Sequence, residues 1–92
     1  MSAKVKMYST RFCPYCIRAR MVLESKGVEF EDIGVDGDPE RRREMMELSG
    51  RRTVPQIWVG DTHVGGYDDL AALEYQGALD ELLNMAPQAS WQ

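Results

Sequence analysis

The chain has 92 residues, of which 43% are hydrophobic and 28% charged, the proportions of an ordinary globular protein. Its net charge of −4 and its pI near 4.9 argue against a general nucleic-acid binder. No apolar run is long enough to span a bilayer and no apolar signal region follows the first lysines, so we expect a cytoplasmic protein. We expect one domain over residues 1–92, ordered from about residue 4 to 84, with a loose polar tail at 85–92.

Strands and helices are expected to alternate in the first half of the chain. Residues 5–8 alternate apolar and polar side chains and predict a strand, and residues 14–26 predict a helix that stops at Gly27. The inward stripe of that helix is expected to contain Cys16, Ala19, Val22 and Leu23. A second strand at 28–33 and a second helix at Pro39–Ser49 follow, with Met45, Met46 and Leu48 as its apolar contacts. This order predicts that the first two strands are parallel.

The second half is expected to open with an antiparallel hairpin. Gln56–Val59 and residues 62–64 predict two strands joined by a two-residue turn, Gly60-Asp61. Asp68 and Asp69 are expected to cap a helix that runs to about residue 75, and residues 79–83 predict a last short helix. Trp91 in the tail is expected to be at most a stray apolar contact.

The only two cysteines stand three residues apart, where the first strand gives way to the first helix. Residues i and i+3 of a helix share a face, so Cys13 and Cys16 are placed to close a small disulfide ring and open it again. Cys13 is nearer the unpaired N–H groups at the positive end of the helix, which favour a thiolate, and Pro14 fits the first helical position. Cys13 is therefore the candidate nucleophile, and Cys16 the candidate resolving thiol of a redox-active disulfide.

The cysteine pair has two alternative roles, as a structural disulfide or as part of a zinc site. A structural disulfide that closes so short a loop removes little entropy from the unfolded chain, so it would stabilise the fold weakly. A structural zinc ion needs four ligands, whereas one chain offers two cysteines and the distant His63. We therefore expect no metal within one chain, although a site shared between two chains stays open.

Five arginines in two groups bracket one short segment of the chain. They are Arg41, Arg42, Arg43, Arg51 and Arg52. In an otherwise acidic chain they could give an anionic small molecule a positive corner, although most of them are expected to be solvated side chains on the surface.

From residue 5 to residue 83 the sequence resembles the glutaredoxins, especially the small bacterial dithiol class. Four features carry the resemblance: Cys13-Pro14-Tyr15-Cys16 after the first strand, Thr53-Val54-Pro55 before the third, Gly65-Gly66-Tyr67-Asp68-Asp69 at the third helix, and the order of the elements. One Cys-x-x-Cys motif is only moderately specific, whereas all four features in register are strongly so. The resemblance implies an α/β, thioredoxin-like fold with a four-stranded mixed sheet, built as βαβ then ββα, and helices on both faces.

The resemblance also implies a glutathione groove beside Cys13. Its residues would be Arg11, Tyr15, Arg42, Thr53, Val54, Pro55, Gly66, Asp68 and Asp69. In the family, the backbone before a cis-proline, here Val54, holds the cysteinyl unit of glutathione, which agrees with recognition at a strand edge. The acids and backbone N–H groups at the third helix hold the γ-glutamyl end.

A basic or polar residue of the second helix, here Arg42, and a lysine three residues before the first cysteine usually hold the glycyl carboxylate. That lysine position is Thr10 in this chain, so we assign the charge to its neighbour Arg11. Tyr67 is a second departure, because many relatives have a small residue or a cysteine there, and it should alter the rim of the groove.

The implied activity is glutathione-dependent thiol–disulfide exchange on glutathionylated proteins and protein disulfides. Glutathione would be a cosubstrate with no cofactor bound, glutathione reductase and NADPH would recycle it, and a monomer is expected. One rival is a redoxin recharged by thioredoxin reductase that supplies electrons to ribonucleotide reductase, against which the acidic site at residues 65–69 stands. The other is a dimer that carries an iron–sulfur cluster on Cys13 and glutathione, against which Pro14 stands.

Overall fold

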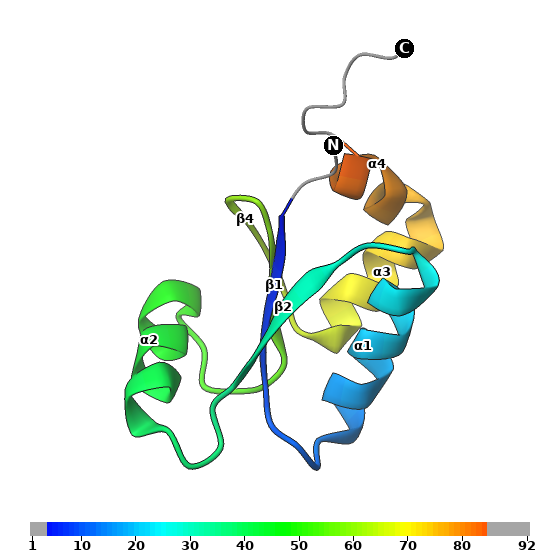
Figure 1. Ribbon diagram of the computed structural model, residues 1–92. Coiled ribbons are helices and arrows are strands. Elements are labelled where there is room, and N and C mark those ends of the chain that lie inside the picture. The colour runs from blue at the N-terminus through cyan, green and yellow to red at the C-terminus, as the bar shows by residue number, and fades with distance from the viewer. Residues whose placement is uncertain (1–3, 85–92) are drawn as a thin grey trace.

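Four short strands form one mixed sheet at the centre of the structure, a computed structural model that describes residues 4–84 (Figure 1). Across the sheet the strands are β2 (Phe30–Gly34), β1 (Val5–Ser9), β3 (Gln56–Val59) and β4 (Thr62–Gly65). The β1–β2 pair is parallel, whereas β1–β3 and β3–β4 are antiparallel. Both the parallel first pair and the hairpin that the sequence predicts are therefore confirmed.

Helices cover both faces of the sheet. They are α1 (Pro14–Ser25), α2 (Pro39–Ser49), α3 (Tyr67–Gln76) and α4 (Ala78–Asn84). Figure 1 shows α2 alone on one side of the sheet, with α1 and α3 side by side on the other. This arrangement is the thioredoxin-like fold, as predicted.

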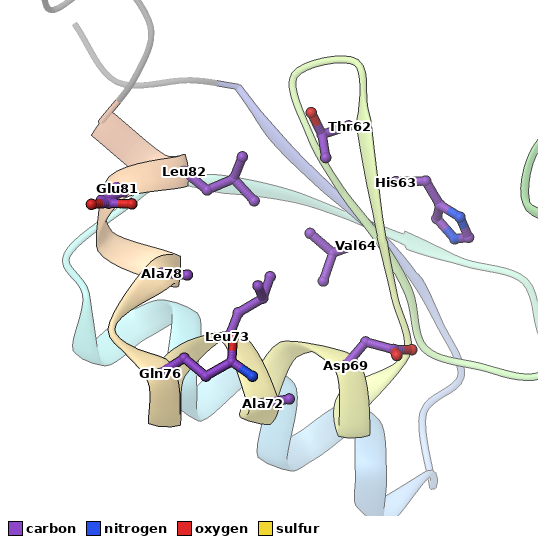
Figure 2. A pocket seen from close by; sticks show the side chains of 10 residues that line it. All are labelled: Thr62, His63, Val64, Asp69, Ala72, Leu73, Gln76, Ala78, Glu81 and Leu82. Carbon is purple, nitrogen blue, oxygen red and sulfur yellow. The ribbon is translucent and has the colours of Figure 1, made fainter.

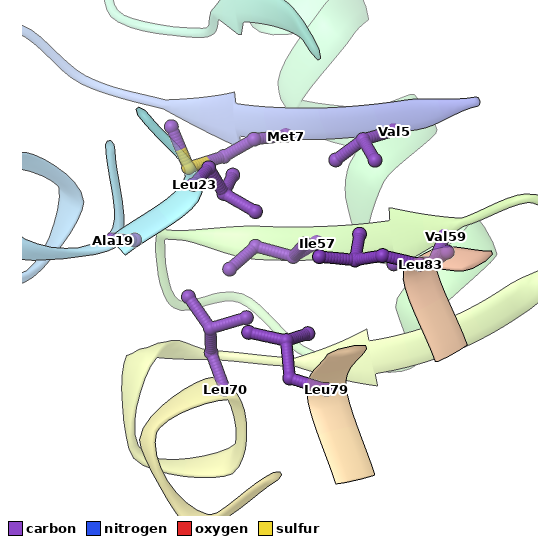
Figure 3. Close-up of a cluster of buried hydrophobic side chains, with 9 residues drawn as sticks. All are labelled: Val5, Met7, Ala19, Leu23, Ile57, Val59, Leu70, Leu79 and Leu83. Carbon is purple, nitrogen blue, oxygen red and sulfur yellow. The ribbon is translucent and has the colours of Figure 1, made fainter. Parts of the chain in front are cut away.

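The larger apolar core lies between the sheet and α1, α3 and α4. Figure 3 shows its buried members, which are Val5, Met7, Ala19, Leu23, Ile57, Val59, Leu70, Leu79 and Leu83. A smaller cluster under α2 contains Tyr8, Val35, Met45 and Trp58. The central strands β1 and β3 supply both clusters because successive side chains of a strand point to opposite faces.

Replacing Leu23 by alanine should lower the free energy of unfolding by about 2–5 kcal/mol. Leu23 is 0% exposed in the larger core, so the shorter side chain leaves a cavity. Met21 on the same helix is 62% exposed, and Met21→Ala should change stability by less than about 0.5 kcal/mol. Chemical denaturation of both variants measures the difference, and equal losses would contradict the assignment of the inward face.

Three details differ from the sequence-based expectations. The second strand begins at Phe30 rather than at residue 28, because its partner β1 begins at Val5, which pairs with Phe30. Leu48 is 55% exposed and is not an apolar contact of α2, because Met45 and Met46 already cover the small cluster there.

The third difference concerns the cap of α3: the N-cap residue is Gly66, and of the two predicted aspartates only Asp69 takes part in the cap, through its side chain at the third helical position. Asp69 lies inside the first turn, and its carboxylate accepts a hydrogen bond from the Gly66 N–H at 3.0 Å. The expected stop near residue 75 is within one residue of the observed end at Gln76. The predictions about the tail and Trp91 fall outside the described residues.

Candidate active site

Cys13 is the N-cap residue of α1, with an extended backbone before Pro14 at the first helical position. Its Sγ accepts a hydrogen bond from the backbone N–H of Cys16 at 3.2 Å. A sulfur that receives an N–H at a helix N-terminus is well placed to carry negative charge. Both cysteines are free thiols in this structure, and Cys13 is partly exposed whereas Cys16 is buried.

Burial raises the pKa of Cys16 to about 12, and its hydrogen bond and charge interaction with Cys13 act in the same direction. The backbone of Thr10 and the guanidinium of Arg20 oppose this rise. Cys16 is therefore a protonated thiol at neutral pH as long as Cys13 is not part of a disulfide. The buried position and the protonated state suit a resolving thiol rather than the first nucleophile, and the roles assigned to the two cysteines stay predictions.

A pocket of about 320 Å³ opens beside Cys13. It is lined by Tyr15, Arg51, Thr53, Val54, Pro55, Gly66, Tyr67, Asp68 and Asp69. The thiol of Cys13 lies 3.8 Å from the carbonyl oxygen of Val54, which joins the sulfur to the pocket. The Val54–Pro55 peptide bond is cis, as the resemblance implies.

Asp69 organises the acidic end of the pocket. Its Oδ2 accepts from the Gly66 N–H and lies 3.0 Å from Nη1 of Arg51. The Gly66 N–H, and then the Arg51 side chain, hold the pKa of the Asp69 carboxyl below its usual range. Gly65 is required at this turn, because its φ is +114° and a Cβ there would collide with the Asp69 carboxylate.

Asp69→Asn should make the protein less stable at neutral pH by about 0.5–1 kcal/mol, a small effect because the side chain is 44% exposed. A lowered carboxyl pKa stabilises the fold above the unfolded-state pKa and ceases to do so as the pH falls through the folded-state pKa. The difference between variant and wild type should therefore shrink as the pH falls from about 5 towards 2. Denaturant titrations across this range measure it, and a difference independent of pH would contradict the ionic role.

Two predicted residues lie outside the pocket. Arg11 pairs with Asp36 at 3.1 Å and its side chain is 78% exposed, whereas Nη1 of Arg42 donates to the carbonyl oxygen of Arg52 at 3.4 Å. Arg11, through its backbone N–H first, holds the pKa of Asp36 below its usual range. The roles of Arg11 and Arg42 in binding a carboxylate stay predictions.

Two residues absent from the predicted set line the pocket, Arg51 and Tyr67. Arg51 was one of five clustered arginines expected mostly to be solvated, and its place two residues before Thr53 is the signal that could have singled it out. The ring of Tyr67 stacks against Tyr15 with centroids 6.2 Å apart, and the guanidinium of Arg18 lies 5.7 Å from the Tyr15 ring. Tyr67 therefore forms part of the pocket's lining, and its effect on the groove relative to other glutaredoxins stays a prediction.

A larger groove of about 540 Å³ lies between β4 and helices α3 and α4 (Figure 2). Its floor is mainly apolar, with Val64, Leu73 and Leu82 pointing into it. The smaller pocket is the candidate active site, because its lining residue Val54 contacts the Cys13 sulfur, whereas no residue that lines the larger groove has a hydrogen bond with either cysteine. Among residues 4–84, no group of three or more His, Cys, Asp or Glu side chains could hold a metal ion.

Comparisons with known proteins show which family this chain resembles. A glutaredoxin family model matches residues 5–64. The glutaredoxin of Pseudomonas aeruginosa is 58% identical over 80 residues, which cover 87% of this chain and 95% of that protein. The solution structure of a Brucella melitensis glutaredoxin has a TM-score of 0.80 at 47% identity and covers 99% of this chain and 96% of its own.

A crystal structure of a buckwheat glutaredoxin–glutathione complex has a TM-score of 0.81 at 25% identity, and the match covers 87% of this chain and 76% of that one. The fold and the paired cysteines at the start of α1 define a thiol–disulfide oxidoreductase of the thioredoxin-fold class. Within that class, the chain belongs to the glutaredoxin family.

Proposed function

We propose that this protein uses glutathione to reduce protein–glutathione mixed disulfides and protein disulfides. The observation that carries the proposal is the pocket that joins Cys13 to the cis Val54–Pro55 bond and to the acidic turn at Asp69. The similarity to a glutaredoxin that has been crystallised with glutathione supports it.

The pocket suits a γ-glutamyl peptide at two points. Among residues 4–84, no backbone hydrogen bond inside the protein uses the N–H of Val54, so it is free to pair with an extended peptide. At the other end, Asp68 and Asp69 provide acceptors for an ammonium group, and the first N–H groups of α3 provide donors for a carboxylate. A cysteinyl unit held at Val54 brings its sulfur to Cys13.

The reaction is a sequence of thiolate attacks on disulfides. The Cys13 thiolate attacks the glutathione sulfur of a mixed disulfide, the substrate thiolate leaves and takes a proton from water, and glutathione stays on Cys13. A second glutathione thiolate then attacks the glutathione sulfur, which releases Cys13 and glutathione disulfide. The cycle consumes one free glutathione, and the disulfide of the substrate is exchanged for that of glutathione disulfide.

Protein disulfides take a second route through Cys16. Attack by Cys13 gives a mixed disulfide with the protein, and attack by Cys16 on the Cys13 sulfur closes the ring and releases the reduced protein. In that intermediate Cys13 carries neither a charge nor a free thiol, so the contributions of Cys13 that raise the pKa of Cys16 are gone. Burial, the main cause of the raised pKa of Cys16, still acts in that intermediate, so only the smaller part of the opposition to deprotonation is removed.

Glutathione reductase and NADPH would reduce the glutathione disulfide, and the reducing cytoplasm would be the compartment. Glutathione is a cosubstrate in this scheme rather than a bound cofactor, and the protein acts as a monomer. Within residues 4–84 no helix is both long enough and apolar enough to span a membrane.

Consumption of NADPH, coupled through glutathione and glutathione reductase, tests the proposal with a glutathionylated protein as substrate. We expect turnover that depends on all three components. Turnover with thioredoxin reductase but not with glutathione would replace the proposal by the redoxin alternative. Visible absorbance of the purified protein, retained with glutathione in a dimer, would favour the iron–sulfur carrier instead.

A further inference from the structure

The side chain of Gln56 is a polar group in the interior, with 0% of the residue exposed. Its Nε2 donates to the carbonyl oxygen of Thr53 at 3.0 Å and reaches the Thr53 hydroxyl at 3.2 Å. Its Oε1 lies 2.8 Å from Nε2 of His63. A buried amide is costly unless it is fully hydrogen-bonded, and this one has partners at both ends.

These contacts set the direction of each hydrogen bond. The Thr53 carbonyl oxygen can only accept, so the nitrogen of the Gln56 amide must face it and the oxygen must face His63. His63 must then carry a hydrogen on Nε2 to donate to Gln56. A chain of hydrogen bonds therefore runs from His63 through Gln56 to Thr53.

Packing against Trp58 fixes His63, the first residue of this hydrogen-bonded series. His63 pairs with Trp58 across the β3–β4 hairpin, and the two rings lie 4.7 Å apart between centroids. Figure 2 shows the His63 ring on the opposite side of β4 from Val64, which points into the apolar groove. Gln56 and Trp58 are two residues apart in β3 and share a face, so the ring of His63 reaches the Gln56 amide.

Thr53, the last residue of the hydrogen-bonded series, belongs to the wall of the candidate active site. Thr53 and Val54 line the pocket and lie outside the regular strands. Among residues 4–84, no backbone-to-backbone hydrogen bond holds either residue, so the Gln56 amide is the hydrogen-bonding partner that fixes Thr53. Val54 follows directly and presents its carbonyl oxygen to Cys13.

We propose that Gln56 and His63 are positioning residues, which hold the Thr53–Val54 backbone in the conformation that binds the cysteinyl unit of glutathione. Neither side chain lines the pocket, so both act through Thr53. The inference rests on the proposed glutathione-dependent function and deepens it, because it names what makes the binding edge rigid. Because the edge contacts glutathione in the ground state and the transition state alike, loosening it should weaken binding more than it slows chemistry.

The experiment compares steady-state kinetics on a glutathionylated peptide for wild type, Gln56→Leu, His63→Phe and the double variant. Gln56→Leu should raise KM about tenfold and change kcat by less than about twofold. His63→Phe keeps an aromatic ring on Trp58 and should raise KM less. Because both residues act through one chain, the double variant should be no worse than Gln56→Leu alone. Gln76→Leu makes the same chemical change on the exposed surface of α3 and should behave as wild type.

The rate at which iodoacetamide alkylates Cys13 is the second readout, and it should be equal in all folded variants. A wild-type KM in both single variants, or additive effects in the double variant, would overturn the inference and leave the proposed function intact. Equal loss of kcat and of alkylation rate would also overturn it, because it would indicate general damage near Cys13. If Gln56→Leu does not fold, His63→Phe alone decides through the same KM and kcat comparison. No turnover by the wild type would instead refute the proposed function, and the inference with it.

Discussion

Cys13→Ser should abolish turnover of a glutathionylated substrate, with a loss on the order of a thousandfold or more. In the proposed mechanism, either route starts with attack by the Cys13 sulfur, and a serine hydroxyl is not ionised at neutral pH. The N–H of Cys16 that now donates to the sulfur at 3.2 Å would donate to the serine oxygen, so helix α1 should keep its cap. The NADPH-coupled assay measures the loss, and thermal unfolding checks that the variant is folded.

Substantial activity in folded Cys13→Ser would contradict the assignment of the nucleophile. Cys16 could not easily take over the attack, because it is 0% exposed and its pKa is raised to about 12. Because Cys16 cannot replace Cys13, the loss of activity in Cys13→Ser should not be offset by the second thiol.

Cys16→Ser should separate the two activities. The exchange with glutathione needs only Cys13, so turnover of a glutathionylated protein should stay within about threefold of wild type. Release of a protein disulfide through ring closure needs Cys16, and that activity should fall at least about a hundredfold at low glutathione. Parallel assays with a glutathionylated protein and a disulfide-containing protein measure the two activities.

Equal losses in both assays would mean that Cys16 supports the site as a whole rather than resolving one intermediate. Because Cys16 is buried on the inward face of α1, the serine also places a hydroxyl in an apolar interior. Comparison at a temperature where both proteins are fully folded separates this cost from the chemical role.

The elements of the fold follow closely from local signals in the sequence. The proline after Cys13 and the glycine at position 50 mark a helix start and a helix end that the structure reproduces. The start of β2 at Phe30 was harder to predict, because it is set by pairing with β1, and the sequence of one strand does not show where its partner begins. The exposure of Leu48 has the same origin, since the size of the cluster under α2 is a tertiary property.

The candidate site could be predicted from the sequence by a different kind of signal. Motifs separated by about 40 residues meet at the contact between Cys13 and Val54, and the resemblance to a family rather than periodicity predicted that meeting. The position of Arg51 depends on its ion pair with Asp69, a contact between side chains that no local pattern encodes. The chain from His63 through Gln56 escaped prediction for a similar reason, because a buried amide in an apolar strand carries no sign of its partners.

The proposed function requires that Cys13 takes up glutathione from a mixed disulfide. Mass spectrometry of Cys16→Ser after reaction with a glutathionylated protein, in the absence of free glutathione, tests this step, since the variant has no second thiol that could displace glutathione from Cys13. We expect one glutathionyl group per chain, located on the peptide that contains Cys13, and its removal by free glutathione. A variant that stays unmodified while the substrate protein is reduced, or that becomes linked to the substrate protein rather than to glutathione, would contradict the account.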